Sequence, residues 1–194
     1  MPSDPITREK TALDVRWDGL GFDIRTSVRY HQRRVRFFDR WNATTNAVVL
    51  FSGSSAVMTL LTEWLTQKAA IVVFGGIVSV FALIDLVVGT ARMARIHEVL
   101  YRQYIDLECQ WTAIHEPTEI AFSDLESAKL RLEQGEPPPL ITLVELCWND
   151  TARSMGSDYR IVGIKRLQKM LANFWSFEDP SHQRKDLDKA VQIV

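Results

Sequence analysis

A single carboxylate stands inside the most apolar part of the sequence. Residues 69 to 91, AAIVVFGGIVSVFALIDLVVGTA, contain one charged residue, Asp85. An ionisable group in so apolar a helix either pairs with another polar group or lines a path for ions or protons. Arg92 follows on nearly the same helical face, and Asn46 occupies a comparable place in the preceding apolar stretch. We therefore predict a polar clasp of Asp85, Asn46 and Arg92, with an ion-path or gating role for Asp85 as the alternative.

Five arginines form a stripe just before the first apolar stretch. Their spacings of four, four, three and four residues confine them to an arc of about 80° on a helix. They are Arg25, Arg29, Arg33, Arg36 and Arg40. A stripe of this kind is typical of a surface that faces water or lipid headgroups. A binding site for an anionic partner and the lining of a pore vestibule are the alternatives.

No pattern in the sequence indicates an enzyme. A phosphate-binding glycine loop, a nucleophile elbow and a His-Glu-x-x-His motif are all absent. Cys109 and Cys147 lie far apart, and the CWND segment offers its cysteine no base. The scattered histidines, expected at helix interfaces or on the surface, are His31, His97, His115 and His182. We expect no catalytic residue, no metal and no cofactor, and the net charge of −1 gives no reason to expect nucleic acid.

Two apolar stretches are long enough to cross a membrane. Residues 42 to 62 carry no charge, and residues 69 to 91 carry only Asp85. A helix needs about twenty apolar residues to cross a hydrocarbon core of ~30 Å. We therefore predict transmembrane helices at residues 42–65 and 69–91, joined by a tight turn into an antiparallel hairpin. A soluble protein that buries both helices is the alternative.

The distribution of positive charge predicts the orientation of this hairpin. The arginine stripe precedes the first stretch, and Arg92, Arg95 and Arg102 follow the second, whereas the turn between them offers only Lys68. Since positive residues accumulate on the cytoplasmic side, both termini should be cytoplasmic. The sequence thus predicts a multi-pass protein of the inner membrane.

Small residues cluster at similar depth in the two predicted spans. They include Gly53 and Ser54 in the first, and Gly75, Gly76 and Ser79 in the second. Helices in lipid associate where small side chains allow their backbones to approach. These clusters could pack the hairpin on itself or against the hairpin of another copy, and the sequence leaves both arrangements open.

The rest of the chain reads as helical, so the predicted fold class is all-α. No Gly or Pro interrupts residues 90 to 116, so we expect the second span to continue as one helix of about 47 residues. Capping boxes are expected at Ser123 and at Thr142, and a last helix at residues 158–175. The predicted segments are a polar N-terminal segment (1–23), a basic cytoplasmic helix (24–41), the two spans (42–65 and 69–91), a cytoplasmic stalk (92–116), a C-terminal helical module (118–177) and a tail (178–194).

Three segments resemble the SLATT family, two-transmembrane effector domains associated with nucleotide-second-messenger conflict systems in bacteria. They are RYHQRRVRFFDRWN, AVVLFSGSSAVMTLL and ARMARIHEVLYRQYIDLECQW, and the resemblance covers roughly residues 25–112. It implies a protein that forms pores or otherwise damages the host membrane once a nucleotide-sensing partner signals infection. The segment from Leu132 to Gly156 departs from the family's core pattern, and the chain carries no sensor domain of its own.

These observations lead to two hypotheses about function. The first is an oligomeric inner-membrane pore or ion-channel-like protein in which the cytoplasmic helices control assembly, with the role of an effector in bacterial or phage conflict that the resemblance implies. The alternative is a membrane-anchored interaction protein whose cytoplasmic helices dock a partner. The expected partners are membrane lipid, further copies of the chain and a cytoplasmic regulatory protein.

Overall fold

A computed structural model describes residues 11–54, 59, 67–157 and 161–176. The elements in these ranges are helices, with no strand among them, which confirms the predicted all-α class. They are α1 (Ala12–Gly53), α3 (Gln67–Val88), α4 (Thr90–Ala113), α5 (Glu119–Gln134), α6 (Ile141–Ser154) and α7 (Arg166–Leu171). The predicted turn around residues 63–68 falls mostly outside the described residues, and the predicted tail at 178–194 falls wholly outside them.

The chain divides into two compact units. The terminal unit comprises Met1–His31 and Leu100–Val194, and the central unit comprises Gln32–Val99. Because α1 and α4 are long, each contributes one part to each unit.

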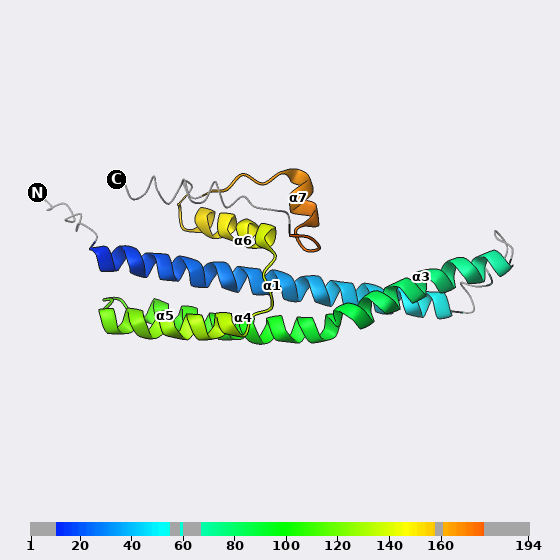
Figure 1. The fold of residues 1–194 in the computed structure, drawn as a ribbon, viewed down its shortest axis with the longest axis horizontal. Helices are drawn as coiled ribbons and strands as arrows, with labels where there is room; N and C mark the ends of the chain where they lie inside the picture. Colours follow the sequence, from blue (N-terminus) through cyan, green and yellow to red (C-terminus); the bar gives the residue numbers. More distant parts are fainter. Residues whose placement is uncertain (1–10, 55–58, 60–66, 158–160, 177–194) are drawn as a thin grey trace, which may run out of the picture. The chain divides into compact units, whose positions relative to one another are not determined.

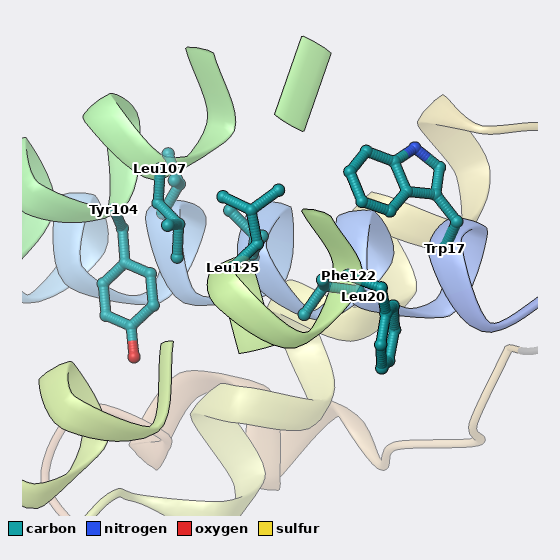
Figure 2. Packing of buried hydrophobic residues seen from close by; sticks show 8 residues of the cluster. Trp17, Leu20, Tyr104, Leu107, Phe122 and Leu125 are labelled. Atoms are coloured by element: carbon teal, nitrogen blue, oxygen red, sulfur yellow. The ribbon is translucent and has the colours of Figure 1, made fainter. Parts of the chain in front are cut away.

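In the terminal unit, α1 is buried on two opposite faces. Trp17, Leu20, Ile24 and Val28 recur at three and four residues and form one face, which packs against α4 and α5. The cluster is completed by Tyr104, Leu107, Phe122 and Leu125. Figure 2 labels side chains of this cluster from all three helices: Trp17 and Leu20 of α1, Tyr104 and Leu107 of α4, and Phe122 and Leu125 of α5. The first half of α1 is therefore an interior helix of this unit (Figure 1).

The opposite face of α1 packs against α6. Phe22 is 1% exposed, and its ring meets that of Trp148 at 4.4 Å between centroids. A second cluster joins Tyr30 of α1 to Leu143 and Cys147 of α6 and to Ala172 beyond α7. The first half of α1 thus lies between α6 on one side and α4 and α5 on the other, as Figure 1 shows.

Local sequence explains where the helices of the terminal unit begin and end. Thr11 and Asp14 cap α1 reciprocally, because each backbone N–H donates to the other's side chain, at 2.9 and 3.2 Å. Thr118 caps α5 by accepting from the Ala121 N–H at 3.2 Å. Gly156 has φ 67°, a conformation that favours glycine, and it follows the end of α6.

Several predicted boundaries were wrong. Helix α1 begins at Ala12, inside the segment that we separated as polar. Ser123 and Thr142 lie within α5 and α6 and do not cap them. The last helix is only Arg166–Leu171, since residues 161–165 are not helical.

The predicted uninterrupted helix from the second span into the stalk is also wrong. Gly89 has φ 61°, a conformation that a residue with a side chain rarely adopts, and it separates α3 from α4. The two helices meet there at a bend of 42°. Gly89 stands directly before Thr90, just outside the range of residues 90 to 116 that contains no Gly or Pro.

Within the described ranges, no helix taken alone has the length and apolar character to cross a membrane. One bent pair satisfies the same criteria jointly, by length and composition: Val72–Val87 together with Thr90–Ala113. The two-span membrane hairpin therefore stays a prediction.

Candidate functional site

Asp85 lies at the break between α3 and α4. Its carboxylate accepts a hydrogen bond from the hydroxyl of Thr90, which is 2% exposed. Its backbone carbonyl accepts the Gly89 N–H at 2.8 Å. The acid thus binds the first turn of α4 across the glycine that ends α3.

The structure does not bring the three predicted clasp residues together. Asn46 and Arg92 are both exposed, and the described residues include no hydrogen bond or ion pair from either to Asp85. The expected pairing with Arg92 assumed a continuous helix, and Gly89 breaks it. Thr90, five residues beyond the acid, is the partner that sequence reasoning missed.

The small residues of α3 face open space. A Cβ built on Gly75 or Gly76 would meet nothing within 4 Å, and Ser79 is exposed. Ser54, just beyond the end of α1, is partly buried, and Gly53 is the last residue of that helix. The cluster on α3 therefore remains available for a neighbouring helix.

The central unit exposes an unusual amount of apolar side chain. On α3 the large exposed residues are Val72, Val73, Ile77, Val80, Leu83, Ile84, Leu86 and Val87, and on α1 they are Val49, Leu50 and Phe51. Leu86 and Val87 are 79% and 82% exposed. Soluble monomers rarely expose contiguous apolar surface on this scale, so such a surface marks an interaction with lipid or with protein.

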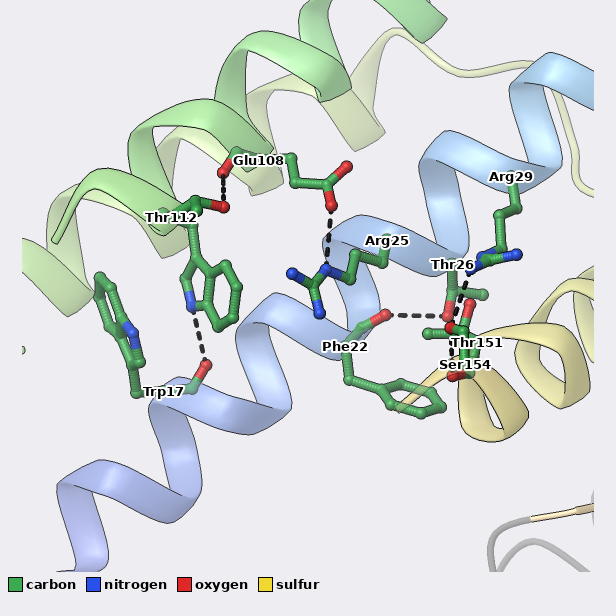
Figure 3. A network of polar contacts seen from close by, with 10 residues as sticks. Trp17, Phe22, Arg25, Thr26, Arg29, Glu108, Thr112, Thr151 and Ser154 are labelled. Carbon is green, nitrogen blue, oxygen red and sulfur yellow. Dashed lines mark hydrogen bonds and ion pairs between the residues drawn. The ribbon is translucent and has the colours of Figure 1, made fainter. Parts of the chain in front are cut away.

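The arginine stripe divides into two parts with different surroundings. In the terminal unit the Arg25 Nε donates to Glu108 at 2.9 Å, and Arg29 donates to the Ser154 hydroxyl at 2.8 Å, as the dashed lines in Figure 3 show. The Arg25 guanidinium also lies 4.8 Å from the ring centre of Trp111. These two arginines join α1 to α4 and α6 and do not form a free basic surface.

The remaining arginines of the stripe belong to the central unit. Arg36 and Arg40 are exposed, and Arg33 is partly buried. They immediately precede the apolar part of α1, so the surface facing water or lipid headgroups stays a prediction for this part of the stripe.

The arginine that packs most closely in the central unit is Arg34, outside the predicted stripe. Its guanidinium lies 4.4 Å from the ring centre of Phe38, and that ring stacks on His97 at 5.8 Å. Arg34 is 9% exposed and His97 1% exposed. Further along, Trp41 of α1 meets Phe81 of α3 at 5.9 Å. An arginine, a histidine and three aromatic residues thus pack together in the central unit.

A second buried polar cluster ties the connector between α5 and α6 to the helices of the terminal unit. Glu136 accepts from the Tyr104 hydroxyl at 2.5 Å, and its carboxylate lies 3.2 Å from His31 Nε2. The imidazole of His31 also stacks on the Tyr104 ring. Burial and the adjacent carboxylate raise the pKa of Tyr104 far above its ordinary value, so the phenol remains a proton donor.

His31 and His97, which sequence reasoning expected at interfaces or on the surface, both lie at contacts between helices. His31 is fully buried and His97 is nearly so. Each lies on the inward face of a long helix beside an aromatic ring. His31 is three residues after Val28 and His97 is three residues before Leu100, and this helical spacing from buried apolar residues could have predicted their burial.

The CWND segment has a structural role in α6. The Asn149 amide donates to the Val162 carbonyl and accepts the Val162 N–H, both at 2.7 Å. Cys147 is fully buried in the apolar cluster with Tyr30, Leu143 and Ala172, whereas Cys109 is exposed. Among the side chains that the structure describes, no three potential metal ligands lie close enough to hold an ion.

Comparisons with known proteins add no relative: no protein-family model matches the chain, and neither curated proteins nor solved structures show significant similarity.

Proposed function

We propose that the chain is a membrane-embedded homo-oligomer whose central unit forms a pore or ion-conducting assembly. The observation that carries the proposal is the exposed apolar surface of α3 and of the end of α1. In water this surface would cost on the order of 25 cal/mol per Å², whereas lipid tails and neighbouring apolar helices cover it without that cost. The terminal unit, with its own apolar cores, is the part that we place in the cytoplasm.

Two contacts support a hairpin of α1 with the helices that follow it. Phe38 meets His97, and Trp41, further along α1, meets Phe81, which is earlier in the chain. As the residue number on α1 rises from 38 to 41, the residue number of the contacting partner falls from 97 to 81. This is the pattern of helices that run antiparallel. Arg36 and Arg40 then stand at the cytoplasmic entry of the first span, as the distribution of positive charge predicts.

The open face of α3 supports assembly with further copies. Gly75, Gly76 and Ser79 leave room for another backbone, and small residues at such positions are the usual contacts between helices in lipid. The exposed amide of Asn46 would also gain a hydrogen-bonding partner from a neighbouring hairpin. A pore-forming oligomer is also what the resemblance to SLATT effectors implies.

The alternative function is that of a membrane anchor with a partner-docking cytoplasmic unit. It is favoured by the extent of the terminal unit, which has two apolar clusters and several side-chain bonds between helices. An anchor needs the membrane hairpin but no conducting path. The two functions therefore differ in ion flux and agree on insertion.

Ion release from liposomes tests the pore. Full-length protein reconstituted into potassium-loaded liposomes should release the ion, at a rate that rises more steeply than linearly with protein density because several copies form one path. The Ser79→Leu variant should slow release at equal insertion by filling the open face of α3. The Val80→Leu variant, which adds bulk at the adjacent exposed position, should not. Folded, inserted protein that leaves the liposomes tight at every voltage tried would favour the anchor.

A further inference from the structure

The short helix α7 and the turn after it expose apolar and basic side chains together. The exposed apolar residues are Leu167, Met170, Leu171, Phe174 and Trp175. Met170 is 76% exposed and Trp175 70% exposed. The basic residues at the start of α7 and within it are also exposed: Lys165, Arg166 and Lys169. Residues 161–176 include no acidic residue, so the positive charge of this segment is not offset within it.

The structure holds this segment in place against the terminal unit. Ala172 is fully buried in the cluster with Tyr30, Leu143 and Cys147. The hydroxyl of Ser176 accepts the backbone N–H of Ile141 at 3.2 Å, which closes the turn onto the start of α6. The apolar side chains are therefore exposed while the backbone of the segment is held at Ala172 and Ser176.

The combination fits the surface of an anionic membrane better than a protein partner. Exposed leucine, methionine and tryptophan side chains enter the boundary between headgroups and acyl chains, while lysine and arginine bind the lipid phosphates. Tryptophan is enriched at that depth in membrane proteins. A basic residue near an anionic leaflet is attracted by its negative surface potential.

The cluster that buries Ala172 also contains Tyr30 of α1. Tyr30 precedes Asn42 by twelve residues on the same helix. Asn42 is the first residue of the predicted first span.

We propose that residues 165–175 form a docking surface for the anionic lipid headgroups of the membrane that holds the central unit. The inference rests on the membrane location in the proposed function and adds to it a lipid requirement in the terminal unit. Docking would fix the terminal unit against the membrane surface, and it would depend on the lipid composition of that membrane.

Hydrogen exchange on the full-length protein tests this surface. The chain is incorporated into lipid nanodiscs of phosphatidylcholine, with or without added phosphatidylglycerol, and amide exchange of residues 165–175 is followed by mass spectrometry. We expect exchange to be slower by roughly tenfold or more in the anionic discs, because three basic residues face the lipid phosphates. Raised salt should reverse part of this protection, since it screens exposed charges.

Paired variants separate this surface from general charge effects. Arg166→Gln with Lys169→Gln should abolish the lipid-dependent protection. Arg131→Gln with Arg153→Gln removes the same charge from exposed positions of α5 and α6 and should preserve it. Trp175→Ala should weaken protection even at low salt, because the apolar contribution does not depend on charge.

The outcomes distinguish failure of this inference from failure of the proposed function. If the chain enters the discs and residues 165–175 exchange equally in both lipids, docking is wrong and membrane insertion stands. If the chain does not enter the discs, both are wrong. Protection that persists in detergent and ignores salt would indicate a protein contact, such as another copy or an acidic peptide, and would also overturn the lipid assignment.

Discussion

Replacing Val80 and Leu83 of α3 together by lysine is expected to abolish membrane insertion. The two side chains are 55% and 59% exposed. In a soluble protein, exposed substitutions of this kind usually change stability by less than about 0.5 kcal/mol. At the centre of a membrane helix each lysine costs about 2.5 to 3.5 kcal/mol, so the pair should shift the inserted fraction by several orders of magnitude. The measurement is the share of full-length protein that remains in membranes after an alkaline carbonate wash.

A matched variant shows whether position or charge is responsible. Val15 and Val99 are 52% and 55% exposed, and both lie outside the predicted spans. Replacing both by lysine should leave the retained fraction unchanged. Equal retention of the α3 variant and this control would mean that α3 does not lie in lipid.

Gly21→Ala is expected to destabilise the terminal unit by about 1 to 3 kcal/mol or more, the usual cost of overpacking. A Cβ at Gly21 would overlap the indole ring of Trp111. That ring cannot easily move, because its N–H donates to the Trp17 carbonyl at 3.1 Å and the Arg25 guanidinium covers its face. It also stacks on the Trp17 ring. The measurement is denaturant unfolding of the full-length protein, followed by tryptophan fluorescence.

Gly19 provides the control for this prediction. It lies two residues earlier in the same helix, and a Cβ there would meet nothing within 4 Å. Gly19→Ala should stabilise the protein by about 0.5 to 1 kcal/mol, since alanine favours the helix over glycine. If both substitutions changed the free energy of unfolding in the same direction, Trp111 would not pack against α1 in this way.

Periodicity predicted the helical class because it is a property of local sequence. The apolar residues of α1 recur at three and four positions, and the structure places those from Trp17 to Val28 against α4 and α5. The start of α1 was also readable, since Thr11 and Asp14 have the spacing of a capping box. It was missed because the segment before residue 24 was judged only by its polarity.

The partners of buried polar groups could not be predicted in the same way. Glu136 lies in a proline-rich connector, and nothing in its neighbourhood indicates that it binds His31 and Tyr104, which are 105 and 32 residues away. Such pairs depend on how the chain folds back on itself. Asp85 illustrates a related limit. Gly89 ends the helix between Asp85 and Arg92, so Asp85 binds Thr90 and not the expected partner, Arg92.

The arginine stripe shows that one pattern can serve two purposes. Its regular spacing suggested a single surface, yet Arg25 and Arg29 bond to Glu108 and Ser154 within the terminal unit. Arg36 and Arg40 remain exposed. The periodicity of one helix carries no information about which neighbour ends beside each part of it.

Cysteine accessibility tests most directly whether the central unit lies in lipid. Single cysteines replace Val73, Val80 or Val15, which are 50%, 55% and 52% exposed, in a chain whose exposed Cys109 is changed to serine. The full-length variants are reconstituted into liposomes and treated on both sides with a charged maleimide. We predict that the Val15→Cys variant is labelled at once, whereas the Val73→Cys and Val80→Cys variants are labelled only after detergent dissolves the bilayer. Labelling of all three at the same rate in intact liposomes would contradict the account.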